Sequence, residues 1–294
     1  MGAVLYFKGP VQRYMTIKYF NYTHLITLLL AGTLVGALYF SLRKRSALAK
    51  EIALYILMGL NITQHLFKFW VWPHLWGTGF GLYNTAYNVC AILIIASPFV
   101  FVANSSLLKQ FITYAGTIGA TLALLFPYWY IGKTVLTWDF ARFWTCHALL
   151  IATSVLPALW GLVKFNCRDG WKFGLVFLAM LSLILVNNTV FSLALGHATK
   201  ETLYEVLLTQ NPLMMMAPTA GAEKVKILFE IFSPPFLLET DTHPYIPILW
   251  YAIPVYLYCT ALGYILGCAL DRQWAKRGKS PIKQPVCGIR TCSL

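Results

Sequence analysis

All but one of the charged residues in this chain lie outside seven long apolar runs. The exception is Lys68, inside the second run. Each run is close to the roughly 20 residues that an α-helix needs to cross the hydrocarbon core of a bilayer. Backbone polar groups inside a bilayer must bond to one another, so helix is the expected state of every run. The sequence therefore predicts an all-α polytopic membrane protein, a bundle of seven transmembrane helices.

The composition agrees with this class of protein. Charged residues make up 11% of the chain and apolar residues 59%, whereas about a quarter of the residues in a soluble domain are charged. The first run is too long for the apolar core of a signal peptide, and no small-residue cleavage pattern follows it, so we expect a retained span. We expect residues 1–294 to form a single membrane domain. The approximate bounds of the runs are 20–42, 52–72, 82–102, 110–131, 143–163, 173–195 and 245–270.

Lys and Arg are unevenly divided between the two sides of the predicted bundle. Most of the 23 basic residues fall in residues 43–51, at Lys109, in residues 164–172 and in a basic tail, residues 271–294. The positive-inside rule then places the C-terminal tail in the cytoplasm and the N-terminus on the extracytoplasmic or lumenal side. The net charge of +13 is thus mainly a topology signal. The basic residues are not gathered on a soluble face, so we expect no nucleic-acid partner.

The longest connection, residues 196–244, holds the dense acidic patch and is predicted to lie on the extracytoplasmic side. A helix over residues 222–232 would place Val225, Leu228 and Phe229 on one face, a pattern typical of a helix in the interface plane. The methionines at 214–216 are candidates to dip into the bilayer edge or line a lipid groove. Loops of this length are usually functional or disordered, so we expect a lid over the outer face.

Two absences narrow the function. No Asp or Glu lies inside any predicted span, which counts against a proton- or cation-coupled carrier. The seven cysteines form no metal-spaced pair, and their odd, scattered arrangement argues against a disulfide framework. No metal or cofactor is implied.

Polar side chains inside the runs gather at one depth. At helical rise they lie roughly 7–15 Å below the outer interface. Polar groups in lipid are costly to maintain and usually mark function, so we predict a membrane-embedded site built from four helices. Its candidate residues are Gln64, His65, Cys90, His147, Asn187 and Asn188.

Cys90 is predicted to share a helix face with Tyr83 and Tyr87. A cysteine within a span is most often an apolar filler, but a thiol beside an imidazole can act as a nucleophile. His147 is either satisfied by a neighbouring helix or serves as a base for Cys90 or for a substrate hydroxyl. Cys146, about 100° away around the helix, is expected to face away from the pocket.

The other polar residues each have two interpretations. Asn187 and Asn188 could orient the imidazole or donate to an oxyanion, and joining two helices is an equal alternative. Gln64 and His65 have the same ambiguity. Lys68 is expected to extend towards the outer interface, with binding of a lipid phosphate as the alternative.

Beginning at Asn88-Val89-Cys90, the sequence resembles the transmembrane protein 164 family and its bacterial YwaF-like relatives. The resemblance covers roughly residues 61–270. Family members resemble acyltransferases that use a cysteine and a histidine to move fatty acyl chains between phospholipids, including onto ether lysophospholipids. Carried over, Cys90 would be the nucleophile and His147 the base. The other matching segments are Ser97-Pro98, Leu125-Phe126-Pro127, residues 143–147, Pro157, Leu159-Trp160, Asn187-Asn188 and residues 211–218.

The sequence and the resemblance together predict a membrane-embedded phospholipid acyltransferase that works on phospholipid and lysophospholipid substrates. Two alternatives stay open: a lipid hydrolase with the same Cys-His pair, and a non-catalytic lipid- or solute-binding or transport protein. Cys90 and His147 are the predicted catalytic residues. The predicted supporting residues are Asn187, Asn188, Gln64, His65 and Tyr87.

Overall fold

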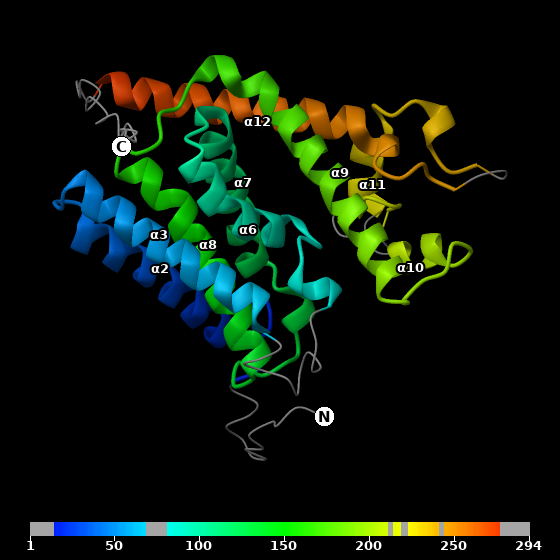
Figure 1. Cartoon of the computed structure of the whole chain (residues 1–294), viewed down its shortest axis with the longest axis horizontal. Coiled ribbons are helices and arrows are strands. Elements are labelled where there is room, and N and C mark those ends of the chain that lie inside the picture. The colour runs from blue at the N-terminus through cyan, green and yellow to red at the C-terminus, as the bar shows by residue number, and fades with distance from the viewer. Residues whose placement is uncertain (1–14, 69–80, 211–213, 219–222, 241–243, 277–294) are drawn as a thin grey trace, which may run out of the picture.

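The computed structural model describes residues 15–68, 81–210, 214–218, 223–240 and 244–276 (Figure 1). Within these ranges the chain is helical, and its strand-type pairing is limited to an isolated antiparallel bridge between Thr16 and Thr134. The α-helices are α2 (Tyr22–Leu42), α3 (Ala47–Leu66), α6 (Val89–Val102), α7 (Ser106–Leu125), α8 (Trp138–Leu159), α9 (Gly170–Ala194), α10 (Leu203–Gln210), α11 (Glu223–Glu230) and α12 (Leu249–Lys276). Short 3₁₀ turns are η1 (Leu82–Asn84), η2 (Tyr128–Tyr130), η3 (Cys167–Asp169) and η5 (Pro235–Leu237).

The all-α prediction is confirmed, but the count of seven spans is not. Each predicted run contains a helix, although the end of the second run, residues 69–72, lies outside the described residues. Helix α6 has only 14 residues, and α3 carries Lys50 and Glu51 near its start. The described segments long and apolar enough to cross a membrane number five: Tyr22–Leu42, Ser106–Tyr130, Trp138–Leu159, Cys167–Ala194 and Leu249–Leu270.

Side-chain caps decide where the helices of the site begin. The Asn88 side chain accepts a hydrogen bond of 2.9 Å from the Ala91 amide, which starts α6 at Val89. The predicted run began at Leu82, but residues 82–84 form the separate turn η1. Cys90 therefore lies in the first turn of α6, and the helix face that it was predicted to share with Tyr83 and Tyr87 does not exist.

Helix α8 lies at the centre of one half of the molecule, where α2, α3 and α7 all pack against it (Figure 1). Helix α6 packs on α3 and α7, and α9 pairs extensively with α12. Two glycines allow α9 and α12 to pack closely. A Cβ added at Gly174 would come within 2.5 Å of the Tyr256 ring, and one at Gly263 within 2.2 Å of the Phe173 ring. These two helices can therefore approach backbone to backbone.

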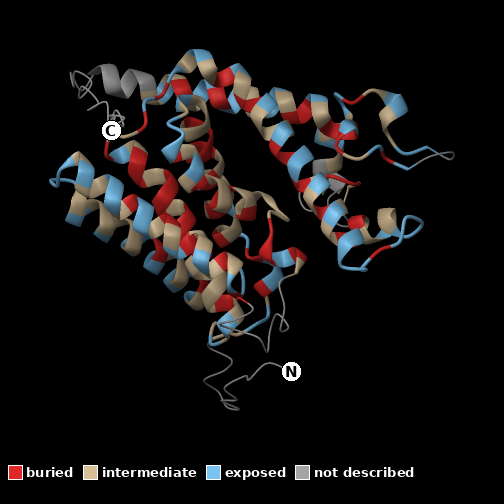
Figure 2. Ribbon diagram, viewed as in Figure 1, coloured by how far each residue is buried: buried red, intermediate tan, exposed pale blue. Residues whose placement is uncertain are grey.

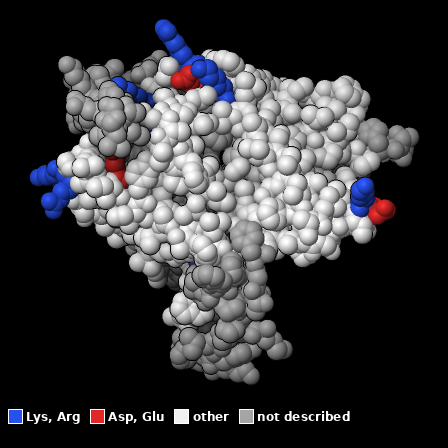
Figure 3. Space-filling model, viewed as in Figure 1, with Lys and Arg blue, Asp and Glu red and all other residues white. Residues whose placement is uncertain are grey.

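The outward faces of the long helices are apolar. On α2, Leu29 is 69% exposed and Ile26 is 56% exposed, and exposed residues follow the outer side of the helices (Figure 2). In the space-filling view the broad middle of the visible face carries neither acidic nor basic side chains, which gather near its edges (Figure 3). Such a surface suits lipid rather than water.

At each end of the bundle, connecting segments that the predicted topology places on the same side of the membrane contact each other. Thr16 and Thr134 meet at one end, and Gln110 meets Asp169 at the other. Cys167 of η3 and Cys268 of α12 form a disulfide, with 4.7 Å between their Cα atoms. The sequence argued against a disulfide framework and did not predict this single pair, which forms because the folding of α9 against α12 brings together two residues 101 positions apart.

The connection at residues 196–244 has secondary structure of its own. The predicted helix over residues 222–232 is present as α11, which packs on α12 through the Phe229 ring. Met215 and Met216 are only 1% and 2% exposed, so they pack inside the protein and do not dip into a bilayer edge. The basic tail beyond Lys276 lies outside the described residues.

Candidate functional site

A cavity of about 840 Å³ lies among α6, α7, α8, α9 and α12. Most of its wall is aliphatic or aromatic, and its volume falls in the range of small-molecule sites. Its lining on α7 runs from Phe111 to Ala123, a length of about 18 Å at helical rise. Most of the polar groups gather near the start of α6, whereas Tyr114 packs on Phe173 in the apolar part, so the cavity is largely amphipathic in the way that a lipid is. The polar and ionisable lining residues are His65, Tyr87, Asn88, Cys90, Tyr114, Tyr130, Arg142, Cys146, His147 and Cys259.

Cys90 is the second residue of α6 and lines this cavity. The first amide groups of an α-helix have no acceptor within the helix, and they form its positive end. A thiolate, or an oxyanion formed beside it, is stabilised at such a position. The apolar walls act in the opposite direction, because burial disfavours a charge. A base that removes the thiol proton while the sulfur attacks a substrate would avoid forming a free thiolate in these apolar surroundings.

His147 is partly exposed to the same cavity from α8. Its Nδ1 atom lies 2.7 Å from the carbonyl oxygen of Phe143. A carbonyl oxygen can only accept, so Nδ1 carries the proton, and in the neutral ring Nε2 carries the lone pair. The Phe143 ring packs 4.5 Å from the imidazole, centroid to centroid. The ring is thus held in the tautomer that a general base requires.

Cys90 and His147 both line the cavity. Within the described part of the chain, no hydrogen bond joins the Cys90 sulfur to the imidazole. Catalytic hydrogen bonds are often long or absent without substrate and form only in the reacting complex. Proton transfer between Cys90 and His147 therefore requires a hydrogen bond that forms when substrate is bound.

Two of the predicted supporting residues form one wall of the cavity. His65 Nε2 donates to the Thr85 carbonyl at 2.9 Å, and its ring stacks on Tyr87 with 6.3 Å between centroids and 10° between planes. Both residues line the cavity. The contact between α3 and the segment before α6 thus places the start of α6 relative to the rest of the site.

Asn187 and Asn188 are not among the residues that line the cavity. Asn187 Nδ2 donates to the Thr85 hydroxyl at 2.8 Å, and Asn188 Nδ2 donates to the Tyr87 carbonyl at 3.2 Å. They therefore tie α9 to the segment that leads into α6. These contacts match the helix-joining interpretation and place neither amide on the imidazole.

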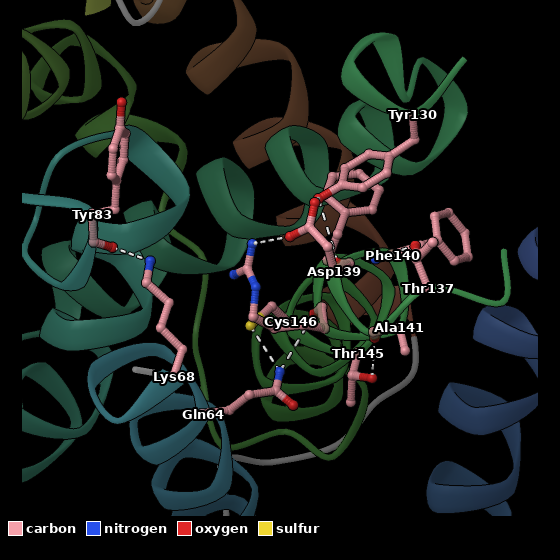
Figure 4. Close-up of polar contacts among 12 residues, drawn as sticks. Gln64, Lys68, Tyr83, Tyr130, Thr137, Asp139, Phe140, Ala141, Thr145 and Cys146 are labelled. Atoms are coloured by element: carbon pink, nitrogen blue, oxygen red, sulfur yellow. Dashed lines mark hydrogen bonds and ion pairs between the residues drawn. The ribbon is translucent and has the colours of Figure 1, made fainter. Parts of the chain in front are cut away.

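Gln64, on α3, is hydrogen-bonded to two residues of α8 that were not predicted to belong to the site (Figure 4). Its Nε2 donates to the Cys146 sulfur at 2.8 Å and to the Arg142 carbonyl at 3.5 Å. Cys146 lines the cavity together with His147, so the expectation that it faces away is wrong. The reason is helical geometry: residues 142, 143, 146 and 147 form one broad stripe of α8, and the cavity is wide enough to meet all of it.

Arg142 lies just before the fifth apolar run and was not predicted as a site residue, but its side chain is 10% exposed and lines the cavity. It pairs with Asp139 at 3.4 Å. The Tyr130 hydroxyl donates to the same carboxylate at 2.8 Å (Figure 4). The four-residue separation from Cys146 places Arg142 on the same face of α8 as that residue, but nothing in the sequence placed this face against the cavity.

Lys68 does not extend to the interface as expected. It is 0% exposed, and its ammonium donates to the Tyr83 carbonyl (Figure 4). Its nitrogen also lies 5.5 Å from the centre of the Tyr87 ring. The turn η1, which the sequence interpretation counted as helix, supplies the carbonyl that captures this side chain.

The predicted lid does not contribute to this cavity. None of the described residues between 196 and 244 is among its lining residues. Helix α11 contacts α12, and Tyr245 joins this packing by donating to Glu230 at 2.6 Å. A role of this segment as a lid stays a prediction.

The sequence model of the TMEM164 family matches residues 19–228, more than half of the 294 residues. The match includes every polar residue of the candidate site described above except Cys259. No curated protein matches the chain significantly, and no solved structure does.

Proposed function

Because the chain belongs to the TMEM164 family, we propose that it is a membrane-embedded phospholipid acyltransferase. It moves a fatty acyl chain onto a lysophospholipid, such as an ether lysophosphatidylethanolamine. One observation carries the proposal: Cys90, at the start of α6, and His147, with its lone pair on Nε2, open into one cavity long enough for an acyl chain.

The first half-reaction forms a thioester. His147 Nε2 takes the proton from the Cys90 thiol as the sulfur attacks the carbonyl carbon of a donor ester. Negative charge builds up on the carbonyl oxygen, and the amide groups at the start of α6 are suited to stabilise it. The carbon–oxygen bond of the ester then breaks, and the imidazolium returns its proton to the departing lysophospholipid oxygen.

The second half-reaction reverses these roles with another lysophospholipid. Its hydroxyl gives a proton to His147 Nε2 while the oxygen attacks the thioester carbon. The carbon–sulfur bond breaks, and the thiolate takes the proton back from the imidazolium. The apolar wall limits the entry of water, which would otherwise hydrolyse the thioester. With water as acceptor, the same residues give the lipid hydrolase.

We also propose an orientation for the chain. The N-terminus faces the extracytoplasmic or lumenal side and the C-terminus the cytoplasm, as the positive-inside rule predicts. The polar end of the cavity, with Arg142 and His65, then lies towards the outer leaflet. The ester groups of a phospholipid also lie just below the headgroups, so donor and site match in depth.

A transfer assay in nanodiscs tests the proposal. Purified protein receives phosphatidylcholine labelled in its acyl chain and lysophosphatidylethanolamine as acceptor. We expect transfer by the parent protein and a loss of at least about a thousandfold in Cys90→Ala, the effect of removing a nucleophile. Cys146→Ala is the matched control, because it removes a second thiol that lines the cavity, on α8 and not on α6. Full turnover in folded Cys90→Ala rules out the covalent mechanism.

One observation favours a second candidate, a non-catalytic lipid-binding protein. Cys90 and His147 are not hydrogen-bonded to each other in the described structure, and an apolar cavity of this size needs no chemistry to hold a lipid. An acyl-labelled Cys90, detected by mass spectrometry after incubation with donor lipid, distinguishes the enzyme from the binder. Binding of lipid without acylation or transfer identifies the binder.

A further inference from the structure

Aromatic rings gather at the apolar end of the cavity. The Phe111 ring of α7 lies 6.3 Å from the Phe173 ring and 6.4 Å from the Phe177 ring of α9, centroid to centroid. All three residues line the cavity, and we refer to them as the end wall. Tyr114, one turn further along α7, packs edge-on against Phe173 at 5.1 Å and extends the same group of rings.

A polar joint lies next to the end wall. Gln110, the neighbour of Phe111 in the chain, is 0% exposed. Its side chain accepts from the Asn166 amide at 3.0 Å and donates to Asp169 at 3.5 Å. An apolar chain that pushed past the end wall would leave these buried groups without partners, which costs free energy. The depth of the cavity is therefore fixed on this side.

The imidazole of His147 lies towards the other end of α7. The Tyr130 ring, just after α7, lies 4.5 Å from the Phe143 ring, and Phe143 packs 4.5 Å from His147. From Ala123 to Phe111 the lining of α7 extends about 18 Å. The hydrocarbon of one leaflet is about 15 Å thick, half of the bilayer core. An acyl chain of an ordinary membrane phospholipid thus matches the length of this wall.

Gly119 leaves space along this wall. It lines the cavity about 6 Å from Ala123 and about 12 Å from Phe111 along the axis of α7. A Cβ added at Gly119 would meet no atom within 4 Å. Gly116 on the same helix differs, because a Cβ there would collide with the Ser154 hydroxyl of α8. Gly116 thus serves helix packing, whereas the missing side chain of Gly119 adds room to the cavity.

We propose that the end wall sets the longest acyl chain that the cavity accepts, and that Gly119 keeps the passage open to chains of that length. A chain that is too short leaves an unfilled apolar space, and a chain that is too long overpacks it, so both bind less well than a chain of matching length. The substrate class is therefore a lipid with a long acyl chain, and short-chain lipids are poor ligands. This inference rests on the proposed lipid substrate but not on turnover.

Native mass spectrometry measures this selection without turnover. Purified full-length Cys90→Ala protein in detergent is equilibrated with an equimolar mixture of lauroyl, palmitoyl, stearoyl and behenoyl lysophosphatidylethanolamine. We expect palmitoyl and stearoyl lipid to be bound in preference to the shorter and longer chains. Gly119→Leu in the same background should lower the bound stearoyl-to-lauroyl ratio at least about tenfold, the scale of overpacking. Phe177→Ala should raise the behenoyl-to-stearoyl ratio at least about fivefold, because it removes a ring from the end wall.

Gly36→Leu is the matched control. It makes the same substitution on α2, where an added Cβ also meets no atom within 4 Å, but Gly36 does not line the cavity. The bound ratios should equal those of the parent. Replacing a helical glycine by leucine favours the helix, so folding should be preserved. If Gly119→Leu nevertheless elutes as an aggregate, Gly119→Ala replaces it and should give a smaller shift in the same direction.

Equal binding of all four chain lengths to the parent overturns the proposal, and so does an unchanged stearoyl-to-lauroyl ratio in the Gly119 variant. An equal shift in Gly36→Leu overturns it too, because the shift would then not come from the cavity. A Phe177→Ala protein that still excludes the behenoyl lipid contradicts the role of the end wall. If the parent binds no lipid at all, the proposed function fails as well, whereas lipid bound without selection by length contradicts this inference alone.

Discussion

The two ends of the helical bundle use buried polar residues in different ways. At the end that holds Cys90 and His147, polar side chains from α3, α8 and α9 hold one another beside a cavity. At the other end, Gln110 is equally buried but only connects helix termini. It accepts from the Asn166 amide at 3.0 Å and donates to Asp169 at 3.5 Å. Polar residues at the same degree of burial therefore serve a site at one end and a joint at the other.

The difference shows what to look for in a membrane protein. A buried polar residue whose partners are all backbone groups or helix caps is accounted for by structure alone. The end near Cys90 contains more: two buried cations, two thiols and an imidazole with an available lone pair. Membrane proteins keep such costly groups where a substrate uses them. The predictions that follow test this division between the two ends.

The largest effect is expected at His147. His147→Ala should lower acyl transfer by about 10²- to 10⁴-fold, because it removes the base that serves both half-reactions. Initial rates in nanodiscs measure it. Phe143→Leu is the control. It removes the ring that packs on His147 but keeps the backbone carbonyl that accepts from Nδ1, so its rate should stay within about tenfold of the parent rate. A His147→Ala rate equal to that of the parent would assign the base to another residue, with His65 the first candidate.

A smaller contrast separates Asn188 from Gln110. Asn188→Ala removes a hydrogen bond to the Tyr87 carbonyl, three residues before Cys90, so it should lower transfer about tenfold to a hundredfold through misplacement of α6. Gln110→Ala should leave transfer unchanged. It should still lower the free energy of unfolding in detergent by about 1–3 kcal/mol, because it leaves buried partners unsatisfied.

Both quantities are measured on the same purified samples. If Gln110→Ala impairs transfer as much as Asn188→Ala at equal stability, the two ends of the bundle are not functionally distinct.

The smallest effect on turnover is expected at the disulfide. Replacing Cys167 and Cys268 by serine should leave the transfer rate within about twofold of the parent, because neither residue lines the cavity. The accessibility of these two cysteines instead indicates the orientation of the protein in the membrane. Disulfides are rare in the cytosol, yet this one lies at the end that the positive-inside rule assigns to the cytoplasm.

A membrane-impermeant maleimide separates these two indications. The background is Cys287→Ser/Cys292→Ser, which removes the thiols of the tail. On the proposed orientation, Cys167 and Cys268 are labelled only after the membrane is permeabilised and the sample reduced. Labelling in sealed cells after treatment with an impermeant reductant would show that the protein has the opposite orientation.

Much of the fold followed from apolar runs and their charged boundaries. The lengths of these runs predicted the long helices, because backbone polar groups in lipid must hydrogen-bond within the same segment. Helix α11 was predicted separately, from the apolar face of residues 222–232. The exact start of α6 could not be predicted, because the sequence of a short apolar segment is compatible with both helix and turn. The structure resolves this, since the Asn88 side chain caps the Ala91 amide. That shift of seven residues moved Cys90 from the interior of a helix to its first turn.

The candidate site followed only in part. His147 and Cys90 were identified by residue type, depth and family resemblance, and both line one cavity. Cys146 was expected to face away, and Arg142 was not singled out, because a sequence places side chains by angle around an ideal helix but does not show how wide the facing cavity is. Lys68 was misplaced for a similar reason, since the carbonyl that holds it comes from η1.

By itself, the sequence determined that this chain is helical and suited to a membrane, because the distribution of charge and apolar length is a local property of the chain. Only the tertiary structure decided which polar groups share a cavity. It placed Arg142 and Cys146 beside His147, and it directed Asn187 and Asn188 to the segment before α6. Such assignments depend on how helices distant in sequence pack, and packing is set by the shapes of all the contacting side chains together.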